Sequence, residues 1–188
     1  NPGSEMAGVP ASEIKAMVSP LLKNKPELVA KRVAELRAAG ITVAGALSPQ
    51  RTLEFHKTLV SAGVDIFVIR GTTLSAEHVS SDDQALNLKK FIYELDVPVI
   101  AGGVASYKAA LHLMRAGAAG VLVGFGGGAS HTTSDVLGLR VPMATAVADV
   151  AAARREYMDE SGGRYVHVIA DGAMGRSGDM IKALACGA

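Results

Sequence analysis

One pattern recurs along this chain and limits what it can fold into. An amphipathic stretch ends at glycine or another turn residue, and a short apolar run follows within a few residues. The runs that we predict as strands are Ile41–Leu47, Val64–Ile69, Val97–Ala101, Gly120–Val123 and Tyr165–Ala170. The stretches between them have helical spacing, and a further helix is predicted from Pro26 to Gly40. Alternating strands and helices predict an α/β protein with parallel strands and right-handed crossovers.

The composition of these strands narrows the choice of sheet. They are continuously apolar and do not alternate, so both faces of the sheet are expected to be buried. An open doubly wound sheet and a closed barrel both satisfy that condition. Repetition of one unit favours the TIM (β/α)8 barrel, which has eight strands. Because about five strands are recognisable, we predict an incomplete barrel that lacks the first two strands and the eighth.

Two segments differ in composition. Residues 1–25 begin with glycine, proline, serine and other small residues, and we expect an N-terminal loop or short helix there. Residues 26–188 are expected to form one partial barrel domain.

Charge and cysteine content exclude several classes of function. The net charge of +1 argues against nucleic-acid binding and against a polybasic membrane surface. No apolar run has the roughly 20 residues that a bilayer span needs, and no signal peptide is recognised. The single cysteine, Cys186, rules out an internal disulfide framework and indicates a reducing cytoplasm. Its predicted place late in the last helix indicates a structural role.

Ligands of parallel α/β proteins bind outside the carboxyl ends of the strands, so the loops after the strands are the candidate site. These loops are rich in glycine, serine and threonine, which lets backbone approach a phosphate or ribose. The segment from Gly124 to Gly138 is the most unusual of them, although a flexible surface loop is the alternative. Asp171 could accept hydrogen bonds from a ribose diol, but a helix N-cap or loop aspartate is equally compatible with its type.

The histidines have no metal-site spacing, and we assign no ligands to them. His56 and His112 are predicted to be surface or packing residues, and His167 a core histidine. His131, inside the glycine-rich segment, is the one histidine with a functional interpretation.

Three motifs occur in order along the chain: Val99–Ser106, Val123–Thr133, and Ile169–Gly172 followed by Ser177–Asp179 and Lys182–Ala188. Together they resemble the strand-five phrase, the catalytic loop and the nucleotide-binding segment of the IMP dehydrogenase and GMP reductase family. The resemblance is closest to an actinobacterial IMP dehydrogenase-related branch without CBS domains.

The resemblance implies a purine nucleotide ligand (IMP, XMP or GMP), NAD as cofactor, K⁺ as a possible monovalent cation and a homotetramer. Asp171 would bind the ribose, and the phosphate would lie near Gly172, Ala173, Gly128 and Ala129. Thr133 would lie beside the base, and the catalytic position would fall on His131. Arg70, Gly102 and Gly103 would contact the cofactor, and carbonyls of Gly126 and Gly128 would surround the cation.

The chain also departs from the family pattern. The family's nucleophile is a cysteine, whereas this chain has His131, and a covalent adduct needs a soft, readily ionised group. Arg70 replaces an aspartate, and Ala129 replaces a phosphate-binding serine. Three interpretations therefore stay open. The first is an NAD-dependent oxidoreductase of IMP to XMP in GMP biosynthesis. The second is a catalytically weak or inactive nucleotide-binding regulator, and the third is a barrel fragment with neither role.

Overall fold

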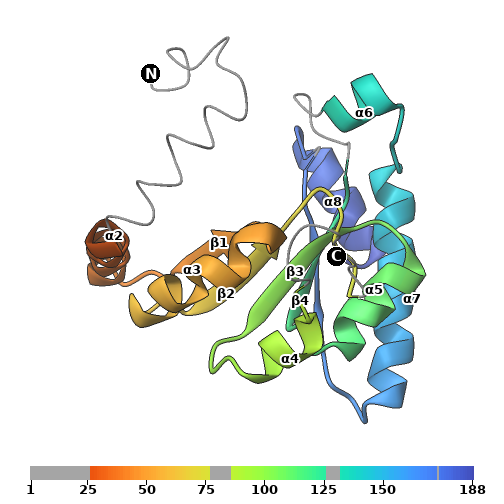
Figure 1. Cartoon of the computed structure of the whole chain (residues 1–188). Coiled ribbons are helices and arrows are strands. Elements are labelled where there is room, and N and C mark those ends of the chain that lie inside the picture. The colour runs from red at the N-terminus through yellow and green to blue at the C-terminus, as the bar shows by residue number, and fades with distance from the viewer. Residues whose placement is uncertain (1–25, 77–85, 126–131, 173) are drawn as a thin grey trace.

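The computed structural model describes residues 26–76, 86–125, 132–172 and 174–188. The helices of this part are α2 (Pro26–Ala38), α3 (Pro49–Ser61), α4 (Leu88–Tyr93), α5 (Tyr107–Arg115), α6 (Thr132–Leu137), α7 (Met143–Glu160) and α8 (Ser177–Cys186). The strands are β1 (Ala44–Leu47), β2 (Ile66–Arg70), β3 (Val99–Val104), β4 (Gly120–Val123) and β5 (His167–Ala170) (Figure 1). The loop or short helix predicted for residues 1–25 lies outside the described residues.

The strands form one parallel sheet in the order β1-β2-β3-β4-β5, so each strand pairs with the next along the chain. With right-handed crossovers, this order places all the connecting helices on the same face of the sheet. A doubly wound sheet would reverse its order at one point and carry helices on both faces. The topology is therefore that of part of a barrel.

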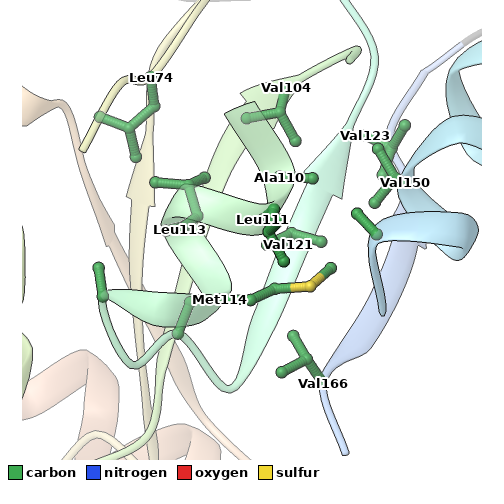
Figure 2. Packing of buried hydrophobic residues seen from close by; sticks show 14 of the residues in the cluster. Leu74, Val104, Ala110, Leu111, Leu113, Met114, Val121, Val123, Val150 and Val166 are labelled. Carbon is green, nitrogen blue, oxygen red and sulfur yellow. The ribbon is translucent and has the colours of Figure 1, made fainter. Parts of the chain in front are cut away.

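The helix-covered face of the sheet holds the core. Val121 and Val123 of β4 are fully buried, and they share one cluster with Leu113 of α5 and Val150 of α7 (Figure 2). Helices α5 and α7 pack side by side over this face, as Figure 1 shows. Small residues on α7, such as Ala146, let the helix approach the strands closely.

The opposite, concave face is covered less than the sequence predicts. Val68, Ile100, Leu122 and Ile169 face this side, and each is only half-buried. The prediction that both faces are buried is therefore wrong for the described residues, because an arc of five strands does not enclose its own inner side. His167 also faces this side and is exposed, so it is not a core histidine.

Two strands extend further than predicted at their carboxyl ends. Arg70 is the last residue of β2, and Gly102 and Gly103 belong to β3. A Cβ atom at Gly102 would lie 2.5 Å from both Cβ and the carbonyl oxygen of Leu122. Glycine is therefore needed for β3 and β4 to approach each other, although glycine normally indicates a loop.

Candidate functional site

A cavity of about 550 Å³ opens at the carboxyl ends of the strands, and we call it the mouth. It is lined by residues that end or follow four of the five strands: Ser48, Pro49, Gln50, Arg70, Gly71, Thr72, Thr73, Gly124, Phe125 and Asp171. Hydroxyl and amide groups dominate its polar lining, and one cation and one carboxylate face each other across it. The volume is in the range of small-ligand sites.

The charged pair at the mouth joins the carboxyl ends of two strands that are not neighbours. The Nε atom of Arg70 donates to Oδ2 of Asp171 at 3.0 Å, and Nη2 donates to Oδ1 at 3.3 Å. Strands β3 and β4 lie between their parent strands β2 and β5, so the contact crosses the concave side. The side chains of Arg70 and Asp171 are 56% and 29% exposed, and an ion pair so open to water contributes only about 0–1 kcal/mol to folding. The pair therefore matters more for what the mouth can bind than for the stability of the fold.

The surroundings of Asp171 remove one of the alternatives for it. Its backbone N–H donates to the carbonyl of Val123 at 2.8 Å and so extends the pairing of β4 with β5. Helix α8 begins only at Ser177, with Arg176 as its N-cap, so Asp171 is not a helix N-cap. The next residue, Gly172, has φ +102° and open space where a Cβ would stand. The backbone after Asp171 is thus accessible to a ligand.

Gly102 and Gly103 are not part of the lining of the mouth, but they bond to the loop after β2, which is. The N–H of Gly103 donates to the carbonyl of Gly71 at 3.0 Å, and the N–H of Gly71 donates to the carbonyl of Gly102 at 2.8 Å. The N–H of Leu74 donates to the carbonyl of Gly103 at 2.9 Å. These bonds attach the loop after β2, whose residues Gly71, Thr72 and Thr73 line the mouth, to the end of β3. That the two glycines contact a cofactor stays a prediction.

The glycine-rich segment is described only at its two ends. Gly124 and Phe125 line the mouth together with Asp171, which confirms that the start of this segment and Asp171 converge at one end of the sheet. Thr133 lies half-buried in α6, a helix that the sequence did not predict. The remaining predicted residues, Gly126, Gly128, Ala129, His131 and Ala173, lie outside the described residues. Their assigned roles stay predictions.

Four polar residues of the mouth carried no individual role in the sequence analysis: Ser48, Gln50, Thr72 and Thr73. Their loops were identifiable because each follows a predicted strand. Which side chains turn toward the cavity depends on the loop conformation, and spacing alone does not give it.

A second cavity, of about 690 Å³, lies at the opposite end of the strands. Its lining includes four cations, Lys89, Lys90, Arg115 and Arg164. The two arginines are held by the protein. The Nε atom of Arg115 donates to Glu160 at 2.9 Å, and Arg164 donates to the carbonyl of Gly117 at 2.7 Å. The hydrogen bond from Arg115 lowers the pKa of the Glu160 carboxyl, and the same bond raises the pKa of Arg115.

Two features are absent from the part of the chain that the structure describes. Within them, no three His, Cys, Asp or Glu side chains are grouped so that they could hold a metal ion. None of the helices in the described ranges is both long and apolar enough to cross a membrane.

Comparison with known proteins relates the whole barrel segment to one family. The family described as "IMP dehydrogenase / GMP reductase domain" matches residues 13–188. A solved structure of an IMP dehydrogenase/GMP reductase-like protein from Corynebacterium glutamicum superposes with a TM-score of 0.79 at 55% identity. The match covers 87% of this chain and 42% of that one.

Sequence relatives agree with the structural match. An uncharacterized oxidoreductase of Mycolicibacterium smegmatis is 62% identical over 164 residues, which are 87% of this chain and 44% of the relative. An inosine-5'-monophosphate dehydrogenase of Haemophilus influenzae is 37% identical over 166 residues, which are 88% of this chain and 31% of the relative. The chain thus spans less than half the length of these relatives. Its parallel five-stranded sheet is part of a TIM barrel, as predicted, and the chain belongs to the IMP dehydrogenase/GMP reductase family of oxidoreductases.

Proposed function

We propose that the mouth binds a purine nucleoside monophosphate (IMP, XMP or GMP) and that Asp171 accepts hydrogen bonds from its ribose hydroxyls. We further propose that the whole protein acts as an IMP dehydrogenase-type oxidoreductase, which converts IMP to XMP with NAD. The observation that supports the binding proposal most is the position of Asp171. Its carboxylate lies in a polar cavity at the carboxyl ends of parallel strands, where barrel enzymes bind their ligands.

The other residues of the mouth suit a ligand of this kind. Ser48, Gln50, Thr72 and Thr73 supply neutral donors and acceptors for the polar edge of a base or for a sugar. Phe125 adds an aromatic surface to the lining. Gly172, which follows Asp171 but is not part of the lining, has open space where a Cβ would stand, and this would let a phosphate approach its backbone closely.

The described lining fits one ribose better than two. Asp171 is the only carboxylate among the described residues that line the mouth, and both its oxygens already accept from Arg70. A second ribose, such as that of a dinucleotide, finds no carboxylate there. We therefore keep NAD as a proposal for the whole protein and derive no step through it. K⁺ at Gly126 and Gly128 is likewise a proposal for residues outside the described ranges.

Nucleotide binding without turnover is the second candidate function. It is favoured by His131, which the resemblance assigns to the position of the family's cysteine nucleophile. An imidazole can act as a base or a hydrogen-bond partner, but it is poorly suited to the covalent addition that a thiolate performs. In that case the protein would regulate purine nucleotide synthesis through binding. A homotetramer and a cytoplasmic location are part of both proposals.

Calorimetric titration of the chain with IMP, GMP and XMP tests the binding proposal. We expect at least one of the three to bind, and its 2',3'-dideoxy analogue to bind at least about tenfold more weakly, because a hydrogen bond to a charged group is worth about 1.5–3 kcal/mol. Absence of binding by all three nucleotides would contradict the proposal, as would equal binding of the dideoxy analogue.

Turnover separates the two candidate functions. The full-length protein and its His131→Cys variant would be assayed for NADH formation from IMP and NAD. Activity in the unaltered protein supports the oxidoreductase. Binding without activity, together with activity gained in His131→Cys, supports the regulator.

A further inference from the structure

The carboxylate of Asp171 already has two donors in the structure. Arg70 presents Nε and Nη2 side by side, one to each carboxylate oxygen, at 3.0 and 3.3 Å. This is the bidentate geometry in which a planar guanidinium matches a carboxylate.

The vicinal hydroxyls of a ribose present the same pattern to a carboxylate, with two neighbouring donors directed at the two oxygens. Each carboxylate oxygen has further lone pairs. A carboxylate has only one place in its own plane, however, from which two neighbouring donors can reach both oxygens at once. The guanidinium of Arg70 and a diol therefore compete for one position on Asp171.

We propose that Arg70 is an internal competitor for the diol and thereby determines which ligands the mouth accepts. The proposal rests on the proposed function, because it assumes that Asp171 is the ribose acceptor. It adds that the free protein holds Asp171 in a closed pair, and that a ligand binds by displacing the guanidinium.

Displacement leaves a positive charge inside the mouth, and the rest of the described lining offers it no second carboxylate. Arg70 is 56% exposed and can turn toward a ligand. A ligand with both a cis-diol and an anionic group can pair with the released guanidinium and recover the lost interaction. A neutral nucleoside cannot do so. Arg70 therefore favours nucleotides over nucleosides.

The expected effect is modest, because an exposed ion pair is weak. Removing the competitor should tighten nucleoside binding about two- to fivefold. Nucleotide binding should change less or become weaker, since the same substitution removes a cation that pairs with the phosphate. The ratio of the nucleoside Kd to the nucleotide Kd should therefore fall.

The test measures Kd for inosine and IMP with the unaltered chain, Arg70→Gln and Arg70→Lys, at low and at high salt. Arg32→Gln is the matched control, since it also removes an exposed arginine–carboxylate pair (Arg32–Glu35, 2.6 Å) but lies in α2, away from the mouth. Circular dichroism would establish that every variant is folded.

For the unaltered chain we expect inosine to bind more tightly as salt rises, because salt screens the pair that it must displace. In Arg70→Gln this salt response should vanish, and inosine should gain affinity relative to IMP. Arg70→Lys keeps the charge but lacks the two parallel donors of the guanidinium, so its inosine affinity and salt response should lie between those two. Arg32→Gln should match the unaltered chain.

Inosine that binds with the same or lower affinity to folded Arg70→Gln would overturn the proposal and make Arg70 a residue that orients Asp171. In that outcome the proposed function stands, because the ligands still bind. If neither inosine nor IMP binds to any of the variants, the proposed function itself fails and this inference fails with it.

Discussion

The two ends of the parallel strands each carry a cavity, and the charged groups in the two cavities have different partners. At the carboxyl end, Arg70 and Asp171 pair with each other across the mouth, and both side chains belong to its lining. At the amino end, Arg115 of α5 pairs with Glu160 of α7, and Arg164 donates to the backbone of Gly117. The charges of the amino end join neighbouring elements, whereas those of the mouth meet inside the cavity.

This difference shows why size and charge are poor guides to the site in this molecule. The amino-end cavity is the larger one, at about 690 Å³, and has more cations in its lining. Its arginines, however, are already used to hold α5, α7 and the turn before β4 together. Barrel proteins generally use the amino end for stability and the carboxyl end for ligands, and the hydrogen-bond partners in this chain follow that division.

Substitution at Asp171 should give the largest effect on ligand binding. Asp171→Asn keeps the shape of the side chain but removes the charge that a diol would use, so we expect nucleotide affinity to fall by about 10- to 100-fold. Stability should change by less than about 1 kcal/mol, because the pair with Arg70 is exposed. Calorimetry and chemical denaturation measure the two quantities.

Asp65→Asn is the matched control for this substitution. Asp65 also pairs with an arginine, Arg37, at 3.3 Å, and its side chain is 34% exposed, but it lies before β2 at the amino end. Its replacement should leave nucleotide affinity unchanged. Equal losses of affinity in the two variants would remove the distinction between the two ends.

Alanine substitution of one glycine at each end of the strands tests the same difference through backbone strain. Gly124 at the mouth has φ +118°, and Gly117 at the amino end has φ +107°. Alanine is strained at both values, so Gly124→Ala and Gly117→Ala should each cost about 1–3 kcal/mol of stability. A Cβ at position 124 would also lie 3.1 Å from the carbonyl oxygen of Asp171.

Only Gly124→Ala should therefore weaken nucleotide binding as well as stability, because it alone shifts the backbone that carries Asp171. Denaturation curves and titrations of both variants give the comparison. Loss of binding in Gly117→Ala at a temperature where it is fully folded would contradict it.

The sequence predicted the order of the strands and of the helices other than α6, because each strand is a short apolar run that follows a turn residue such as Gly63 or Gly117. It also located the mouth, since parallel strands bring the residues after them to one edge. It did not predict that β3 continues through Gly102 and Gly103, because the need for glycine there arises from contact with Leu122 in the next strand. Strand-to-strand packing of this kind is a tertiary effect.

The ion pair at the mouth likewise could not be predicted from local sequence patterns. Arg70 and Asp171 are 101 residues apart, and each was assigned to a different ligand. Only the curvature of the sheet brings them together. The half-exposed state of Ile100 and Leu122 also escaped prediction, because an apolar strand does not reveal how many neighbours enclose it.

The smallest expected effect concerns the amino end and its pH dependence. The hydrogen bond from Arg115 lowers the pKa of Glu160 in the folded protein, so the pair stabilises the fold at neutral pH. The contribution is lost as the pH falls through this lowered pKa and the carboxyl becomes protonated. The difference in thermal midpoint between the unaltered chain and Glu160→Gln should be small and positive at neutral pH and should vanish in acid. A difference that persists in acid would show that packing, not charge, causes it.

Mapping of amide chemical shifts by NMR during titration with IMP tests the central claim most directly, since it locates the ligand at one end of the strands or the other. We predict shifts at Ser48, Thr72, Gly124 and Asp171, which line the mouth, while Asn87, Gly117 and Arg164 stay unchanged. Shifts confined to the residues of the amino-end cavity would contradict the account.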